Sequence, residues 1–186
     1  MNRMHRKLCA SDDWAKTVAQ RLPAGLAEVE LGSRMLEIGP GFGATTRVLA
    51  PMVDELTAIE VDAESAAKLR EEFHDEVTIV TGSGANMPFA DDEFDSVVCF
   101  TMLHHVPSKA LQDNLFAEAC RVLRPGGVFA GFDSQLNFRF RLLHLGDTMV
   151  VVDAATFPDR LRAAGFTDVH LTHEPKRRLT FRAYKP

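Results

Sequence analysis

The feature that most constrains the fold is a glycine-rich turn at residues 36–43, Leu-Glu-Ile-Gly-Pro-Gly-Phe-Gly. A short apolar segment runs directly into Gly39, Gly41 and Gly43. Glycine allows the backbone to take a positive φ and to approach a ligand closely, and a helix that follows presents unpaired N–H groups. The pattern predicts a strand, a ligand-binding loop and a helix at the start of an α/β sheet.

An acidic residue, Glu60, ends the next apolar segment, 17 residues after Gly43. In sheets of this type, an acid at that place accepts hydrogen bonds from the hydroxyls of a ribose, and one carboxylate can accept both. The alternative is that the glycines only form a tight turn and that Glu60 is a solvated charge at the end of a strand. Because both features occur together at the spacing a nucleoside needs, we favour a nucleoside site.

The loop alone also fits the dinucleotide fingerprint, since Gly39, Gly41 and Ala44 match G-x-G-x-x-[GA]. An NAD-dependent oxidoreductase is therefore an alternative. It would need a hydride-transfer acid such as a Tyr-Lys pair, and the single tyrosine, Tyr184, lies in the last predicted strand.

Strand-like and helix-like segments alternate along the rest of the chain, which predicts a parallel α/β sheet. We expect Ser11 to cap the first helix and Pro23 to end it, and Asp62 to cap the helix that follows it. We also expect a turn at residues 125–127 and an antiparallel pair at the C-terminal end of the sheet. Predicted helices cover residues 11–22, 44–52, 63–73, 109–123 and 157–164, and predicted strands cover 35–38, 56–61, 77–80, 96–100, 128–132, 169–173 and 179–184.

The composition narrows the class of protein. The chain has 186 residues and a net charge of −5, which fits one domain and argues against a phosphate backbone as the main ligand. No apolar stretch approaches the ~20 residues of a membrane span, and no signal peptide is visible, so we expect a cytoplasmic protein. Cys9, Cys99 and Cys120 form no CxxC pair, so we expect neither a disulfide nor a metal site.

Six segments in order resemble the class I S-adenosylmethionine (SAM)-dependent methyltransferases, nearest to the type 11 methyltransferase-domain group. They are LEIGPGFGATT (36–46), LTAIEVDAES (56–65), MPFADDEFDSVVC (87–99), HHV (104–106), RVLRPGG (121–127) and LRAAGF (161–166).

The resemblance implies a Rossmann-like three-layer sandwich whose seven-stranded, mostly parallel sheet has an antiparallel last strand. The length and the pattern along the chain predict one domain over residues 1–186, with an N-terminal helical segment at 1–33 and a candidate substrate cover at 134–153. The resemblance also implies transfer of a methyl group from SAM, leaving S-adenosylhomocysteine, to an acceptor by in-line displacement. The contacts implied for SAM are the loop Gly39, Pro40, Gly41, Phe42 and Gly43 on the methionine and ribose part, Glu37 on the amino group, Glu60 on the ribose hydroxyls, Val61 on the adenine, and Thr101 and Met102 on the methionine part.

One position departs from the family pattern. Where the family commonly has an Asp-Ala pair that reads the adenine, this chain has Ser83 and Gly84. Backbone N–H groups at Gly84 or Ala85 could still reach a ring nitrogen, and we expect weaker SAM binding. The missing acid and the short cover keep a non-catalytic SAM- or S-adenosylhomocysteine-binding module as an alternative.

The loop after the fourth predicted strand carries the candidate catalytic residues and also indicates the class of methyl acceptor. His104 or His105 is a candidate general base; the alternative is that one is structural and the other hydrogen-bonds loop backbone. The segment at residues 100–103 lacks the [Asn/Asp]-Pro-Pro-[Tyr/Phe] pattern of nucleic-acid amino-methyltransferases, so we expect a small-molecule acceptor, no nucleic acid and no membrane. Arg139 and Arg141 lie in the candidate cover, and a second subunit in a homodimer is the other way to cover the site.

Overall fold

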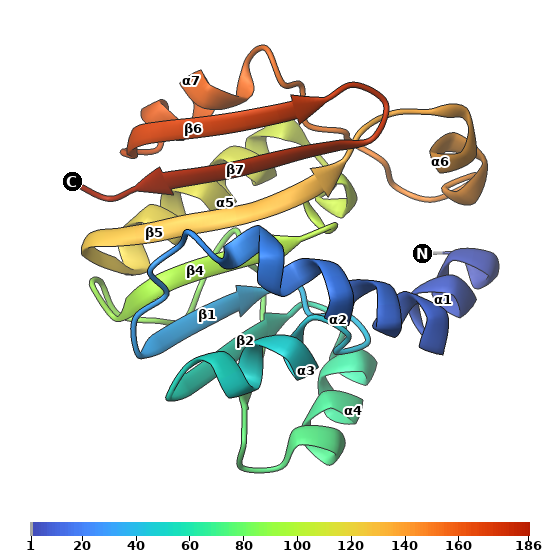
Figure 1. The fold of residues 1–186 in the computed structure, drawn as a ribbon, viewed down its shortest axis with the longest axis horizontal. Helices are drawn as coiled ribbons and strands as arrows, with labels where there is room; N and C mark the ends of the chain where they lie inside the picture. The colour runs from blue at the N-terminus through green and yellow to red at the C-terminus, as the bar shows by residue number, and fades with distance from the viewer. Residues whose placement is uncertain (1) are drawn as a thin grey trace.

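The computed structural model describes residues 2–186, which build one seven-stranded sheet in the order β3-β2-β1-β4-β5-β7-β6 (Figure 1). Strand β7 pairs antiparallel with both β5 and β6, and the other pairs are parallel. The Rossmann-like fold with an antiparallel last strand is confirmed. The strands are β1 (Arg34–Ile38), β2 (Glu55–Glu60), β3 (Thr78–Thr81), β4 (Phe94–Phe100), β5 (Leu123–Ser134), β6 (Thr167–Glu174) and β7 (Arg178–Tyr184).

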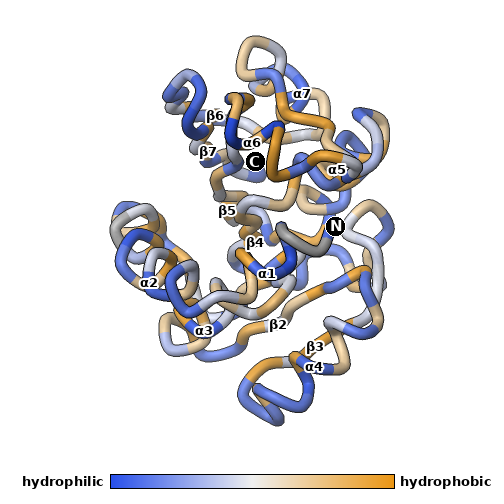
Figure 2. Tube along the Cα trace, turned by 90° about the vertical axis from the view of Figure 1, so that its right-hand side faces the viewer, coloured by the Kyte–Doolittle hydropathy of each residue, from blue (hydrophilic) through white to orange (hydrophobic). Residues whose placement is uncertain are grey.

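Helices cover both faces of the sheet, as the view in Figure 2 shows for α2 and α3 on one side and α5 on the other. Alternation along the central strand β4 explains the two layers: Val97 and Cys99 pack under α5 and α7, whereas Val98 and Phe100 pack under α2, α3 and α4. The helices are α1 (Arg3–Cys9), α2 (Asp12–Leu26), α3 (Thr46–Leu49), η1 (Ala50–Met52), α4 (Ala63–Phe73), η2 (Leu103–His105), α5 (Lys109–Val122), α6 (Phe138–Leu143) and α7 (Phe157–Ala163).

Helix α2 corrects one prediction, because it passes through Pro23 and ends only at Leu26. Ser11 caps its start as expected, accepting a hydrogen bond from the Trp14 N–H. Proline inside a helix removes one backbone hydrogen bond, but Leu22 and Leu26 are each at most 4% exposed and pack against the sheet. Burial of this apolar stripe therefore outweighs the lost bond.

The connection into β5 corrects a second prediction. We expected a helix to Leu123, a turn at 125–127 and a strand from 128. Instead α5 ends at Val122 and β5 begins at Leu123, which pairs with Phe94 before the register shifts. Gly126 takes a φ of +80° there, so the Pro-Gly-Gly sequence bends a strand rather than separating it from the helix.

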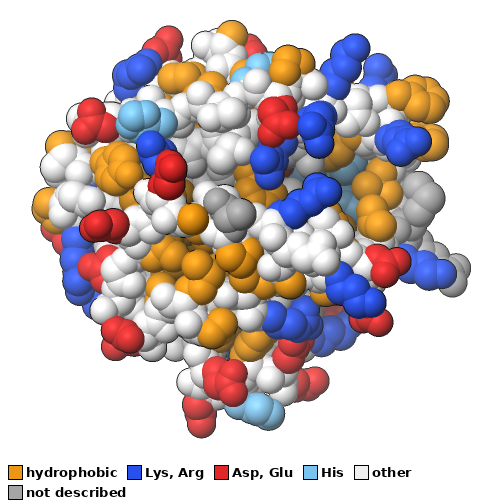
Figure 3. Space-filling view, in the orientation of Figure 1, with side chains coloured by type: hydrophobic (Ala, Val, Ile, Leu, Met, Phe, Trp, Pro, Cys, Tyr) orange, Lys and Arg blue, Asp and Glu red, His pale blue; other side chains and the backbone are white. Residues whose placement is uncertain are grey.

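Two short helices lie outside the five predicted helix ranges: α1, within the N-terminal segment expected to be helical, and α6, inside the expected cover at 134–153. They meet beyond the carboxyl ends of β1, β4 and β5 (Figure 1), where the Asn2 side chain donates hydrogen bonds to the carbonyls of Leu143 and Leu145. Helix α6 carries the exposed Phe138, with Arg139 next to it in the sequence. Figure 3 shows hydrophobic side chains next to Lys and Arg side chains at the upper right of this face. None of the helices in the described chain has the length and apolar character that a bilayer crossing requires.

Candidate functional site

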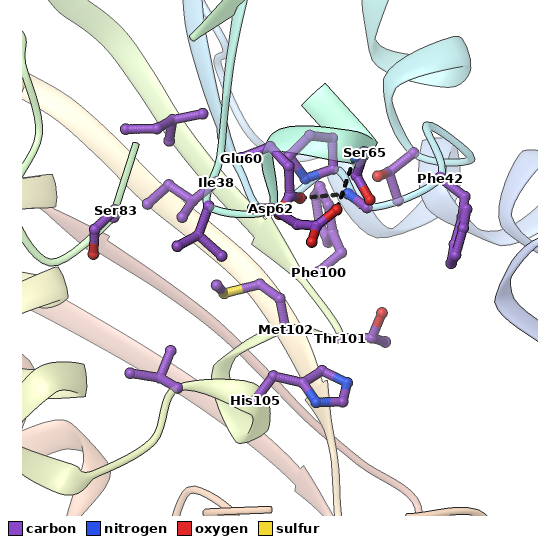
Figure 4. Close-up of a pocket in the computed structure, with 18 of the residues that line it drawn as sticks. Ile38, Phe42, Glu60, Asp62, Ser65, Ser83, Phe100, Thr101, Met102 and His105 are labelled. Atoms are coloured by element: carbon purple, nitrogen blue, oxygen red, sulfur yellow. Dashed lines mark hydrogen bonds between the residues drawn. The ribbon is translucent and has the colours of Figure 1, made fainter. Parts of the chain in front are cut away.

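A cavity of about 450 Å³ opens at the carboxyl ends of β1, β2 and β4. Figure 4 shows Glu60, Asp62 and Ser65 on one side of it and Met102 and His105 on the other. Helices α1 and α2 supply part of the wall through Arg6, Cys9 and Trp14. A volume of this size suits a ligand of nucleoside dimensions.

The glycine loop wraps the end of β1 and needs its glycines for two different reasons. Gly41 has a φ of +57°, and a Cβ there would meet no protein atom within 4 Å, so its face is open to the cavity. Gly43 does not line the cavity. It has a φ of +74°, and a Cβ there would come within 2.9 Å of Leu69 and 3.1 Å of Phe73, so it lets α4 pack against the loop.

Glu60 ends β2 and joins it to the glycine loop. Its Oε2 accepts a hydrogen bond from the Gly41 N–H at 3.0 Å, and its Oε1 accepts one from the Asp62 N–H at 2.9 Å. Each carboxylate oxygen can accept two hydrogen bonds, so each keeps a lone pair for a further donor. Asp62 also caps α4, as expected, by accepting from the Ser65 N–H at 2.8 Å.

Glu37 lies beneath the loop and does not line the cavity. Its carboxylate is 1% exposed and accepts hydrogen bonds from the hydroxyls of Thr45 and Thr46. Burial raises the pKa of Glu37 to about 7, partly offset by these two hydroxyls. In the structure the residue therefore braces the loop from below.

The loop after β3 forms the end of the cavity expected for an adenine. Ser83, Gly84 and Ala85 line it, and Val61, with 73% of its surface exposed, lines the cavity as well. The Ser83 Oγ accepts a hydrogen bond from the Ala85 N–H at 3.2 Å, so that N–H already has a partner. A Cβ at Gly84 would come within 2.8 Å of Ile38, so this position requires a small residue.

The loop after β4 forms the opposite end. Thr101 takes a φ of +52°, and its N–H donates to the Phe132 carbonyl at 2.9 Å. This turn carries Met102 against Gly39, where an added Cβ would lie 3.2 Å from the methionine side chain. Thr101, Met102, Pro40 and Phe42 all line the cavity.

The two candidate catalytic histidines lie in different environments. His104 is 2% exposed and lies outside the cavity lining, with its Nδ1 at 2.6 Å from Asp133 Oδ1 and its backbone N–H donating to Asp133 Oδ2. His105 lines the cavity. Burial, followed by three neighbouring histidine rings, lowers the pKa of His105 to about 3. Its imidazole is therefore neutral at physiological pH, with an unprotonated nitrogen.

Several lining residues were not singled out from the sequence as ligand contacts. The nearest signal was the helix predicted at residues 11–22, which carries Trp14. Arg6 and Cys9 lie on α1, and Thr148 lies in the segment after α6, so only tertiary structure brings them to the site. The additional lining residues include Arg6, Cys9, Thr45, Asp62, Ser65, Pro107, Leu111 and Thr148.

Comparison with known proteins gives a family match over the core of the site. The family described as "Methyltransferase domain" matches residues 36–131. A sterol 24-C-methyltransferase of Gibberella zeae is 26% identical over 162 residues, covering 76% of this chain and 41% of that protein. A ribosomal RNA small subunit methyltransferase A of Bordetella pertussis is 43% identical over 58 residues, covering 31% of this chain and 22% of that protein. The chain thus spans less than half the length of these curated relatives.

A solved structure with the same fold is the phosphoethanolamine N-methyltransferase 2 of Haemonchus contortus in complex with S-adenosyl-L-methionine. It superposes with a TM-score of 0.74 at 16% identity, covering 95% of this chain and 53% of that chain. The likeness covers the sheet and the helices on both of its faces.

Proposed function

We propose that this chain, which belongs to the methyltransferase-domain family, is a SAM-dependent methyltransferase that transfers the methyl group of SAM to a small-molecule acceptor by in-line displacement. We take residues 1–186 as one methyltransferase domain, with 134–153 as the cover over the acceptor.

The observation that carries the SAM assignment is the pair formed by Glu60 and Gly41. The carboxylate is fixed by two backbone N–H groups, it borders a cavity of about 450 Å³, and each of its oxygens keeps a free lone pair. Two adjacent ribose hydroxyls are the donors that such a carboxylate suits. The residues present therefore fit the nucleoside half of SAM.

Other assignments follow the cavity lining. Gly39, Pro40, Gly41 and Phe42 would border the methionine and ribose part, Thr101 and Met102 the methionine part, and Val61, Ser83, Gly84 and Ala85 the adenine. Glu37 and Gly43 would act indirectly, because neither lines the cavity: Glu37 through Thr45 and Thr46, and Gly43 through the packing of α4.

The chain's contribution to catalysis would be alignment. SAM supplies an activated methyl group, so the protein has to hold acceptor and methyl donor in line and exclude water. Met102 and the Thr101 turn form the wall at the end of β4, and α1 and α6 meet beyond the carboxyl ends of the sheet. A general-base role for His104 or His105 stays a prediction, and a loss of less than roughly threefold in kcat on replacing each with alanine would remove it.

The charge of the protein favours a small-molecule acceptor over a nucleic acid. The net charge is −5, which disfavours a phosphate backbone as partner, and the ribosomal RNA relative matches only 31% of this chain. Arg139 and Arg141 on α6 lie in the candidate cover and suit an acidic or planar acceptor. A small acidic or aromatic acceptor is our proposal.

The test is calorimetric titration of the purified protein with SAM, S-adenosylhomocysteine and NAD. We expect micromolar binding of both adenosyl ligands, no binding of NAD, and loss of binding in Glu60→Ala. The matched control is Glu55→Ala, at the other end of β2 and exposed. Absence of adenosyl binding, or binding of NAD, would overturn the proposal. Formation of S-adenosylhomocysteine with a panel of small acceptors would then separate an enzyme from a binding module without catalysis.

A further inference from the structure

Four of the seven histidines gather in one place, although they are spread over the sequence. His5 comes from α1, His104 and His105 from η2, and His144 from the end of α6. Their ring centroids are 4.2 Å apart for His5 and His144, 4.2 Å for His104 and His105, and 4.9 Å for His104 and His144. This histidine cluster borders the cavity, because His105 belongs to both.

Three of these rings converge with ligand geometry. His5, His105 and His144 each offer a ring nitrogen, and the three nitrogens lie within 4.8 Å of one another. Two nitrogens bound to one tetrahedral zinc ion at about 2.0–2.1 Å stand roughly 3.4 Å apart. Small side-chain movements would bring the three rings to that spacing.

The outer nitrogens of the cluster already have partners. His144 Nδ1 lies 2.8 Å from the Phe140 carbonyl, and since a carbonyl only accepts, Nδ1 carries the hydrogen. His5 Nδ1 lies 3.3 Å from Asp147 Oδ2. Histidines that bind metals commonly donate their second N–H to a carbonyl or carboxylate in this way, which fixes the ring and leaves Nε2 as the ligand atom.

A fourth histidine, His104, contacts His144 and is held by Asp133. His104 Nδ1 faces the Asp133 carboxylate at 2.6 Å, so it too carries the hydrogen. Its Nε2 lies 3.2 Å from His144 Nε2. His104 is thus held by Asp133 and is not one of the three residues whose nitrogens converge.

The ligand set indicates the class of ion. A metal ion can be bound by several neutral imidazoles at once. The three converging side chains include no carboxylate, which favours a borderline transition metal over Mg²⁺ or Ca²⁺.

We propose that His5, His105 and His144 form a binding site for a divalent transition-metal ion of the Zn²⁺ class, at the wall of the cavity. This departs from the expectation that the chain has no metal site. The ion would tie α1, η2 and α6 together, and with three protein ligands it keeps an open position. The inference does not depend on SAM binding.

The experiment uses the full chain without an affinity tag, stripped with a chelator and titrated calorimetrically with Zn²⁺. We expect one equivalent to bind with a micromolar or lower Kd, and binding to weaken at least about tenfold in His144→Ala and in His5→Ala. Asp147→Asn, which leaves all three rings in place, should weaken it by a smaller factor. The matched control is His173→Ala, an exposed histidine on β6 far from the cluster in sequence, and it should bind as the unaltered chain does.

Two outcomes would overturn the proposal. One is no saturable Zn²⁺ binding by the unaltered chain, and the other is binding that His144→Ala and His5→Ala leave unchanged. SAM titration and circular dichroism of each variant show whether it is folded. If a variant fails to fold, the visible absorption of Co²⁺ bound to the unaltered chain still reports whether imidazole nitrogens surround the ion.

Discussion

The Glu60 carboxylate accepts the Gly41 N–H at 3.0 Å and so locks the end of β2 to the loop that follows β1. The same side chain holds the Asp62 N–H at 2.9 Å. The glycine loop and Glu60 therefore form one hydrogen-bonded unit, and a change to either residue should affect SAM binding.

Glu60→Gln keeps the shape of the side chain but removes its charge and one acceptor oxygen. We expect SAM affinity to fall at least about tenfold, since a charge-assisted hydrogen bond to a hydroxyl is stronger than a neutral one. Calorimetry with SAM measures it. Glu55→Gln on the same strand is the control, and equal losses in both variants would contradict a specific ribose contact.

Gly41→Ala adds a methyl group at a φ of +57° with no protein atom within 4 Å. We expect a loss of about 1 kcal/mol in the free energy of unfolding, because alanine disfavours positive φ, together with weaker SAM binding, because the methyl group occupies the cavity. Gly126→Ala is matched, with a φ of +80° and open space but no place in the cavity. It should lose stability alone, and unchanged SAM binding in Gly41→Ala would argue against the loop contact.

Glu37 makes stability depend on pH. Its pKa is raised to about 7 in the folded chain, from 4.5, so between these values the folded state binds more protons than the unfolded state. Stability therefore falls as pH rises from about 4.5 to about 7, by up to about 3 kcal/mol. In Glu37→Gln this fall should disappear, because the amide does not titrate and Thr45 and Thr46 can still hydrogen-bond to it.

Urea unfolding at pH 5 and pH 8 measures the Glu37 effect. The control is Glu71→Gln, at an exposed position on α4, which should keep the pH dependence of the unaltered chain. Parallel stability curves for the Glu37 variant and the unaltered chain would refute the assignment.

Pro23→Ala restores a backbone donor inside α2, where Pro23 is exposed. We expect the free energy of unfolding to rise by about 1 kcal/mol or more, because alanine suits a helix interior far better than proline, an effect reduced by the freer unfolded chain. Thermal unfolding followed by circular dichroism checks it. The control is Pro88→Ala, which lies outside any helix and should not raise the free energy of unfolding. A Pro23→Ala variant that is less stable than the unaltered chain would contradict the prediction and show that α2 needs its proline.

The parts of the fold that follow from local pattern could be predicted from the sequence. Apolar runs bounded by glycine or proline gave the strands, and Ser11 and Asp62 gave the helix caps because their side chains act on residues three positions away. The order of motifs gave the family and with it the antiparallel last strand. Pro23 failed as a stop signal because burial of Leu26, a tertiary effect, decided where α2 ends.

The rest depended on contacts between distant segments. Helices α1 and α6 have seven and six residues, too short to be stable or recognisable by themselves. The histidine cluster joins residues from three short helical segments, α1, η2 and α6, so no spacing in the sequence predicts it. The burial of Glu37 and the separate places of His104 and His105 likewise follow from the sheet and the helices packed on it.

The contact between α1 and the end of α6 has a consequence for ligand exchange. Asn2 bonds to Leu143 and Leu145, 141 and 143 residues further along the chain, and His5 bonds to Asp147. These polar contacts can part and re-form without disturbing a strand. The opening of these contacts between α1 and the segment at 143–147 would then set how long a product stays bound. Trimming or extending the chain at its N-terminal end would alter turnover while the sheet stays intact.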